Sequence, residues 1–185
     1  MARAGTYPGR SAQALAAGDV LPDPLTHFAQ EHLRQREVCA MLDTLATAPQ
    51  PDRVMAREAL RHLSTVLPGH MRDEGHMLFP LLRQSSAPDD EINDTLRRLD
   101  ADHAQSAQAL GAVTAALERI ADTGGALTGE EAAAVSGFAA HKRRHLVVEN
   151  AIVLPLARVR LTVEDLEALR NAMLRRRGAD KGGEG

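Results

Sequence analysis

The sequence predicts an all-α protein. Its segments are rich in Ala and Leu, which favour helices, and no stretch alternates apolar and polar residues as a half-buried strand would. The strongest observation is a two-fold internal repeat: a helix that carries one His is followed by a helix that carries His-x-x-x-Glu, and both then recur. Because repeats define the architecture of a chain, this pattern predicts four helices that form two related halves.

The second helix of each half carries the clearest signal. Both segments read His, three residues, Glu, five residues and Pro-Leu, over residues 70–81 and again over 145–156. Positions four apart lie on the same face of a helix, so the imidazole and the carboxylate of each pair can reach one metal centre. The preceding helix of each half adds one His, His32 and His103, each directly after an acidic residue. The two halves together would supply four His and two Glu.

At these residues the sequence resembles a hemerythrin-like (HHE cation-binding) domain of the bacterial type. The resemblance covers roughly Asp23 to Pro155. It is carried by Asp23-Pro24-Leu25, by Glu31-His32, by Leu78-Phe79-Pro80 after the first repeated Glu, and by Met173 with Arg176-Arg177-Gly178 near the end. The resemblance implies an up-down-up-down four-helix bundle around a non-haem di-iron site.

The expected metal ligands are the repeated residues, namely His32, His70, Glu74, His103, His145 and Glu149. Without a metal, an apolar bundle core would have to hold these carboxylates and imidazoles at a large desolvation cost. Imidazole with bridging carboxylate suits iron, and suits manganese or zinc less well. The expected cofactor is therefore a pair of Fe ions bridged by both Glu residues and by an oxo or hydroxo ligand, with one coordination position open on each iron.

Three further positions have two interpretations each. His141, one turn before the second His-x-x-x-Glu, is either an additional ligand or a partly solvent-facing residue at the edge of the bundle. Its repeat equivalent is Val66, which slightly favours a residue that does not bind metal. Glu31 and Asp102 could each fix the tautomer of a ligand His on an adjacent helix, or could be solvated or interhelical charges. His27 falls on a different face of its helix and is interpreted as a surface residue.

Helix boundaries follow from local signals. The first helix is expected from about Pro24 to Thr47, with Asp23 as N-cap and Pro24 at the first helical position. The other bundle helices are expected over about residues 52–83, 89–122 and 129–158. A Gly-Gly pair ends the third helix, and Thr128 with Glu131 forms a capping box for the fourth. Pro68 should kink the second helix or divide it into two.

The domain organisation is one bundle with additions at both ends. Residues 1–21 are expected to form a flexible N-terminal arm, 22–160 the bundle, 161–178 a short helix packed on it, and 179–185 a tail. The short helix should pack through Leu166, Leu169, Met173 and Leu174. Its Arg175-Arg176-Arg177 run is expected in the last turn, where positive charge suits the helix dipole.

Composition limits the partners. Lys and Arg number 22 against 25 Asp and Glu, a net charge of −3, which implies no nucleic-acid partner. Cys39 is the only cysteine, so the chain has no internal disulfide, and a reducing cytoplasm is the expected location. No long apolar run and no signal-peptide pattern is present, so no membrane partner is expected.

The ligand set is compatible with more than one class of function. The first is a protein that binds or senses O2, peroxide or NO, and a sensor would need a protein partner because no regulatory domain is fused to the bundle. The alternative is an enzyme, a di-iron oxidase or a peroxidase- or catalase-like protein that acts on peroxide or a dedicated small molecule. A third is an interaction module with a zinc or empty site. The catalytic residues of the enzyme remain unknown from sequence.

Overall fold

The computed structural model describes residues 23–182, and the expected flexible arm, residues 1–21, lies outside them. Between these limits all secondary structure is helical, as predicted, and no strand occurs. The segments in chain order are α1 (Pro24–Thr47), α2 (Arg53–Arg61), η1 (His62–Val66), α3 (Leu67–Asp73), η2 (Glu74–Leu78), α4 (Phe79–Gln84), α5 (Glu91–Thr123), α6 (Gly129–Val148), η3 (Glu149–Val153), α7 (Leu154–Arg160) and α8 (Val163–Gly182).

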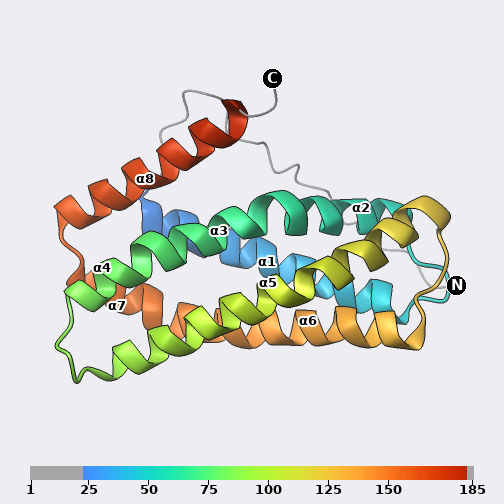
Figure 1. Ribbon diagram of the computed structural model, residues 1–185, viewed down its shortest axis with the longest axis horizontal. Coiled ribbons are helices and arrows are strands. Elements are labelled where there is room, and N and C mark those ends of the chain that lie inside the picture. The colour runs from blue at the N-terminus through green and yellow to red at the C-terminus, as the bar shows by residue number, and fades with distance from the viewer. Residues whose placement is uncertain (1–22, 183–185) are drawn as a thin grey trace, which may run out of the picture.

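These segments form a four-helix bundle with a fifth helix on its outside (Figure 1). Residues 53–84 and 129–160 are helical throughout, so α2 to α4 make one long helix and α6 to α7 another. Successive long helices run in opposite directions, α1 packs on α2 and α6, and α5 packs on α2 and α6. The up-down-up-down bundle is therefore confirmed. None of the described helices is both long and apolar enough to cross a bilayer.

Local capping explains where the helices begin and end. The Asp23 side chain accepts a hydrogen bond from the Thr26 backbone N–H at 2.8 Å, with proline at the first turn. Thr128 and Glu131 form the predicted capping box at the start of α6. Gly124 ends α5 with φ +71°, in the left-handed region that glycine adopts without a Cβ penalty. Each such cap stabilises its helix by about 1 kcal/mol.

The prolines inside the long helices are accommodated by π-helical turns. Proline lacks an N–H and crowds the carbonyl four residues earlier, and a wider turn relieves both problems locally. Each π turn ends two residues before a proline: His62–Val66 before Pro68, Glu74–Leu78 before Pro80, and Glu149–Val153 before Pro155. Pro68 therefore does not divide the second helix in two. Both repeated Glu residues begin a π turn, so the same local feature occurs at equivalent points of the two halves.

Two apolar clusters fill the bundle on either side of a polar middle layer. The α2 cluster includes Val38, Leu42, Leu63, Leu117 and Phe138, and the α8 cluster includes Phe28, Phe79, Leu96, Leu154 and Met173. On α1, buried His32 lies between Phe28 of one cluster and Val38 of the other. Cys39 is buried in the α2 cluster as a free thiol, which agrees with its interpretation as a small packed residue. The candidate site thus lies where solvent cannot readily reach.

Helix α8 packs against the bundle through fewer side chains than predicted. Leu169 and Met173 are fully buried and Leu166 is partly buried against the α8 cluster. Leu174 is 43 % exposed, so its predicted packing was wrong, because it points away from the face that Leu169 and Met173 share. The helix also continues to Gly182 beyond its expected end at Gly178, which removes the arginine run from the last turn.

Substituting Met173 should test how strongly α8 is anchored. Met173→Ala deletes a fully buried side chain and should lower the free energy of unfolding by about 2–5 kcal/mol. The adjacent Leu174→Ala removes a largely exposed side chain and should change it by less than about 0.5 kcal/mol. Urea unfolding followed by circular dichroism measures both, and equal losses in the two variants would contradict the described packing of α8.

Candidate metal centre

The six expected ligands come together in the middle of the bundle. Each lies on a different segment: His32 on α1, His70 on α3, Glu74 on η2, His103 on α5, His145 on α6 and Glu149 on η3. Their nitrogen and oxygen atoms form two groups, each with all ligand atoms within 4.8 Å of one another. One group has the histidines His32 and His70, the other has His103 and His145, and both contain Glu74 and Glu149.

Glu74 presents one carboxylate oxygen to each histidine pair. Its Oε1 lies 3.2 Å from His32 Nε2 and 3.1 Å from His70 Nε2. Its Oε2 lies 3.3 Å from His103 Nε2. A carboxylate whose two oxygens face two different groups of nitrogen donors is placed to bridge two cations.

Glu149 repeats this arrangement from the opposite helix. Its Oε2 lies 3.4 Å from His32 Nε2, whereas its Oε1 lies 2.8 Å from His145 Nε2 and 4.0 Å from His103 Nε2. His103 Nε2 and His145 Nε2 are only 3.1 Å apart, so their lone pairs or protons converge on the same point. The two halves of the internal repeat thus contribute matching sets of donors.

The donor atoms fit metal ions better than they fit one another. His70 Nε2, Glu74 Oε2 and both carboxylate oxygens of Glu149 are buried and make no hydrogen bond. Buried polar atoms without partners are costly, and such atoms are normally hydrogen-bonded or bound to a cation. The chemistry of the set, four imidazoles and two carboxylates, is that of a binuclear site for divalent or trivalent transition metals. The residues present therefore fit a pair of metal ions.

Two acidic residues orient one histidine of each pair. Glu31 Oε2 accepts from His70 Nδ1 at 2.8 Å, and Asp102 Oδ2 lies 3.3 Å from His145 Nδ1. Each acid precedes one histidine in sequence and contacts the other histidine of the same pair across the bundle. A hydrogen bond at Nδ1 fixes the tautomer that leaves Nε2 free for a metal.

His141 lies outside both groups of donor atoms. Its Nε2 donates to the backbone carbonyl of Asp102 at 3.2 Å, so this nitrogen is directed at α5. His76 is exposed and His62 is buried, but neither joins the two groups. The contact of His141 instead links α6 to the segment that carries Asp102.

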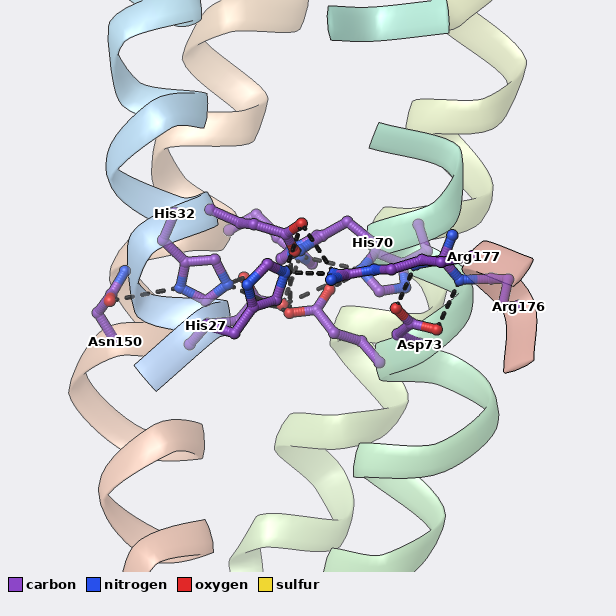
Figure 2. A network of polar contacts seen from close by, with 12 residues as sticks. His27, His32, His70, Asp73, Asn150, Arg176 and Arg177 are labelled. Atoms are coloured by element: carbon purple, nitrogen blue, oxygen red, sulfur yellow. Dashed lines mark hydrogen bonds and ion pairs between the residues drawn. The ribbon is translucent and has the colours of Figure 1, made fainter. Parts of the chain in front are cut away.

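The two halves differ beside His32 and His103. His32 Nδ1 lies 3.3 Å from Asn150 Oδ1, an amide that directly follows Glu149 (Figure 2). The residue at the equivalent position after Glu74 is Gly75, which offers His103 no side chain. The His103 side chain is 11 % exposed, whereas those of His32, His70 and His145 are not exposed. His103 stacks on Phe79 instead, with ring centroids 5.5 Å apart.

Helix α8 reaches the site through two arginines (Figure 2). Arg176 forms a paired contact with buried Asp73, the residue before Glu74, with Nε–Oδ1 at 2.7 Å. Arg177 contacts His27 and lies 3.6 Å from Glu31. The surface interpretation of His27 was therefore wrong: its side chain is 12 % exposed and lies 2.8 Å from Glu31.

Sequence reasoning missed this outer network and Asn150. The four-residue spacing of His27 and Glu31 on α1 was a usable signal for their contact. A second usable signal was the difference between the halves directly after the repeated Glu, where the first half has Gly75 and the second half has Asn150. The arginine contacts had no such signal, because the distance in sequence from Arg177 to His27 is 150 residues.

The electrostatics of the metal-free site depend on these contacts. Burial by itself would lower the pKa of His70, but attraction to Glu74 and the hydrogen bond to Glu31 outweigh it and raise the pKa to about 10. Burial raises the pKa of Glu31, yet hydrogen bonds from His27 and His70 hold it well below its usual range. For Glu74, the charge on His70 likewise outweighs burial and lowers the pKa. Without metal, the proton on His70 thus offsets part of the negative charge of the buried carboxylates.

Glu31→Gln should weaken metal binding. The substitution keeps the size of the side chain but removes the charge that orients His70, and loss of such a contact typically costs about 10- to 100-fold in metal affinity. Glu37→Gln, at an exposed position of the same helix, is the matched control and should leave affinity unchanged. Competition with a chelator of known affinity measures both, and wild-type affinity in Glu31→Gln would refute the orienting role.

Metal binding near pH 7 should release protons. Because the pKa of His70 is raised to about 10, its imidazole is protonated at pH 7 in the metal-free protein and must lose that proton to bind a metal. Affinity should therefore rise with pH between about 7 and 10. Anaerobic calorimetry with ferrous iron in buffers of different ionisation enthalpy counts the protons. Heats that do not depend on the buffer would contradict the predicted exchange.

Comparison with known proteins agrees with the geometry. The sequence matches the family model described as Hemerythrin HHE cation binding domain over residues 23–157. Among curated proteins, none matches the chain significantly. The matched range begins at the N-cap of α1 and ends within α7, so it spans the bundle and all six convergent residues but not α8. The chain belongs to the hemerythrin HHE cation-binding family.

Proposed function

We propose that this protein is a non-haem di-iron protein that binds or reacts with O2, peroxide or NO. The proposal rests on how the two buried carboxylates face the histidines. Glu74 and Glu149 each direct one oxygen toward one histidine pair and the second oxygen toward the other pair. That arrangement suits two cations that share two bridging ligands. Bound iron would supply a redox-active centre with affinity for oxygen-containing diatomic molecules.

The donor set favours iron over the alternatives. Two imidazoles and two carboxylate oxygens per metal give four protein ligands, which is fewer than the six that iron commonly takes. A solvent-derived bridging ligand and one exchangeable position would complete each coordination sphere. A structural zinc site would normally be closed by four ligands of its own without sharing. Manganese remains the nearest competitor because its ligand preferences overlap with those of iron.

The protein would shield the metals from bulk water and hold their ligands in a fixed orientation. Five of the six ligand side chains are 1 % exposed or less, so the bundle excludes bulk water from the metals. Phe28 packs edge-on to His70, and Phe79 stacks on His103, which gives both pairs an apolar wall. Glu31 and Asp102 would hold Nε2 of their histidines toward the metals throughout a reaction.

The second candidate is a di-iron oxidase or peroxidase. A carrier needs only an apolar pocket, whereas an enzyme must also supply groups that handle a charged or polar reactant. Buried Gln35 and Lys142 lie one helical turn from ligand histidines, and their side-chain polar atoms have no hydrogen-bond partner. This polar neighbourhood favours reactivity with peroxide over simple carriage of O2.

Metal analysis should give two iron ions per chain. His103→Ala and Glu149→Ala should each reduce iron content and lower the melting temperature together, because ligand binding energy is partly folding energy. His76→Ala removes an exposed histidine outside both groups and should behave as wild type. Full iron content in both ligand variants would disprove the proposed site.

The optical spectrum then separates the two candidate functions. A charge-transfer band that is lost on reduction and returns unchanged with each exposure to O2 would favour a carrier or sensor. Consumption of O2 or peroxide over many turnovers would favour the enzyme. Zinc in place of iron after anaerobic iron loading would overturn both.

A further inference from the structure

Two adjacent arginines of α8 reach the surroundings of the candidate ligand His70 (Figure 2). Arg176 forms a paired contact with Asp73, with Nε–Oδ1 at 2.7 Å and Nη2–Oδ2 at 2.5 Å. The Arg176 side chain is 15 % exposed and that of Asp73 is 4 % exposed. Two parallel hydrogen bonds between a guanidinium and a buried carboxylate have a fixed geometry, so Arg176 anchors α8 at one height of the second long helix.

Gly69 makes room for this anchor. A Cβ at position 69 would lie 2.4 Å from Nη1 and 2.9 Å from Cζ of Arg176, and Cβ atoms do not approach other atoms so closely. Glycine inside a helix such as α3 costs about 1 kcal/mol relative to alanine. The close approach of the Arg176 guanidinium gives a physical reason for glycine at this position, directly before His70.

Arg177 reaches the carboxylate that orients His70. Oε1 of Glu31 lies 2.8 Å from His27 Nε2 and 3.6 Å from Arg177 Nη2. Oε2 of the same carboxylate accepts from His70 Nδ1 at 2.8 Å. Contacts from α1 and α8 thus hold one oxygen of Glu31, which leaves the other oxygen directed at the ligand. They restrict a side chain that would otherwise have considerable rotamer freedom.

The other half of the repeat lacks this support. Asp102, the acid beside His145, lies 3.3 Å from its Nδ1 and has a side chain that is 36 % exposed, compared with 16 % for Glu31. Among the side chains that the structure describes, no lysine or arginine forms an ion pair with Asp102. His103 of the same pair is also 11 % exposed. Water can therefore compete for hydrogen bonds more readily at this pair than at the pair that contains His70.

We propose that Arg177 is a positioning residue that acts on His70 through Glu31. With Arg176 as its anchor, α8 thereby makes the position between His32 and His70 the tighter of the two metal positions. A ligand that is already held in its binding geometry loses less freedom when the metal arrives, so its affinity is higher. The difference in affinity rests on the binuclear centre of the proposed function, whereas the effect of Arg177 on His70 can also be measured without metal.

Cobalt(II) is the probe, because its anomalous X-ray scattering locates each ion. Full-length protein crystallised with one Co²⁺ per chain should show the stronger anomalous peak between His32 and His70 and the weaker one between His103 and His145. Arg177→Met keeps an apolar stem without the guanidinium and should reduce the ratio of the two occupancies by about 10-fold, which is the lower end of the effect of losing a partner of a metal ligand. The Arg177 side chain is 25 % exposed, so the variant is expected to fold.

Matched variants separate positioning from general stability. Arg177→Lys retains a positive charge at this position and should keep most of the ratio. Arg175→Met removes the neighbouring, exposed arginine and should match the wild type. Gly69→Ala should displace the anchor of α8 and lower the ratio, whereas Gly137→Ala, whose Cβ would meet nothing outside its own helical backbone within 4 Å, should not. A general loss of stability would lower both occupancies together and leave their ratio unchanged.

The metal-free protein provides an independent measurement by NMR. The His70 Nδ1–H is hydrogen-bonded to Glu31 and should exchange slowly with water, and Arg177→Met should speed this exchange by about 10-fold. An unchanged exchange rate would refute the positioning role. Equal cobalt occupancies in the wild type, or an unchanged ratio in Arg177→Met, would overturn the unequal affinity.

The two measurements also distinguish failure of this inference from failure of the proposed function. If cobalt occupies neither position but Arg177→Met still speeds the exchange, the proposed di-iron function is disproved, and the unequal affinity with it, while the positioning role holds. If cobalt occupies both positions and neither the ratio nor the exchange rate responds to Arg177→Met, the binuclear centre stands and this inference is disproved.

Discussion

The burial of two carboxylates between four imidazoles is the constraint on which the rest of this bundle depends. Glu74 and Glu149 are at most 1 % exposed, and neither finds enough hydrogen-bond donors among its protein neighbours. In the metal-free protein the proton on His70 offsets part of this charge, and cations would take the place of that proton.

The contacts around the metal-ligand layer connect distant segments of the chain to this buried site. Glu31 is held by His27, and Arg177 of α8 contacts both His27 and Glu31. A continuous series of contacts therefore runs from a helix outside the matched family range to His70 in the centre. Helix α8 therefore does more than cover the α8 cluster. Its Arg177 helps to position the Glu31 carboxylate, which in turn orients the candidate ligand His70.

Local signals in the sequence were sufficient for the fold and for the convergence of the repeated residues. Asp23, Gly124 and the Thr128 capping box act within a few residues, so helix ends could be predicted closely. The repeat placed six donors at equivalent heights of four helices. The π turns beside the prolines, which keep the second helix continuous, were not predicted. The exposure of Leu174 and the contact of Arg177 with His27 could not be predicted, because they depend on packing between segments far apart in the sequence.

A further buried polar group lies close to the metal-ligand layer. Lys142, three residues before His145 on α6, is 2 % exposed, and its Nζ has no hydrogen-bond partner among the described residues. At a separation of about one helical turn, charges in a dry interior interact strongly because little solvent lies between them. A positive charge on Lys142 would oppose the binding of cations in the neighbouring layer, and the carboxylates of Glu74 and Glu149 would offset that opposition because they carry the opposite charge.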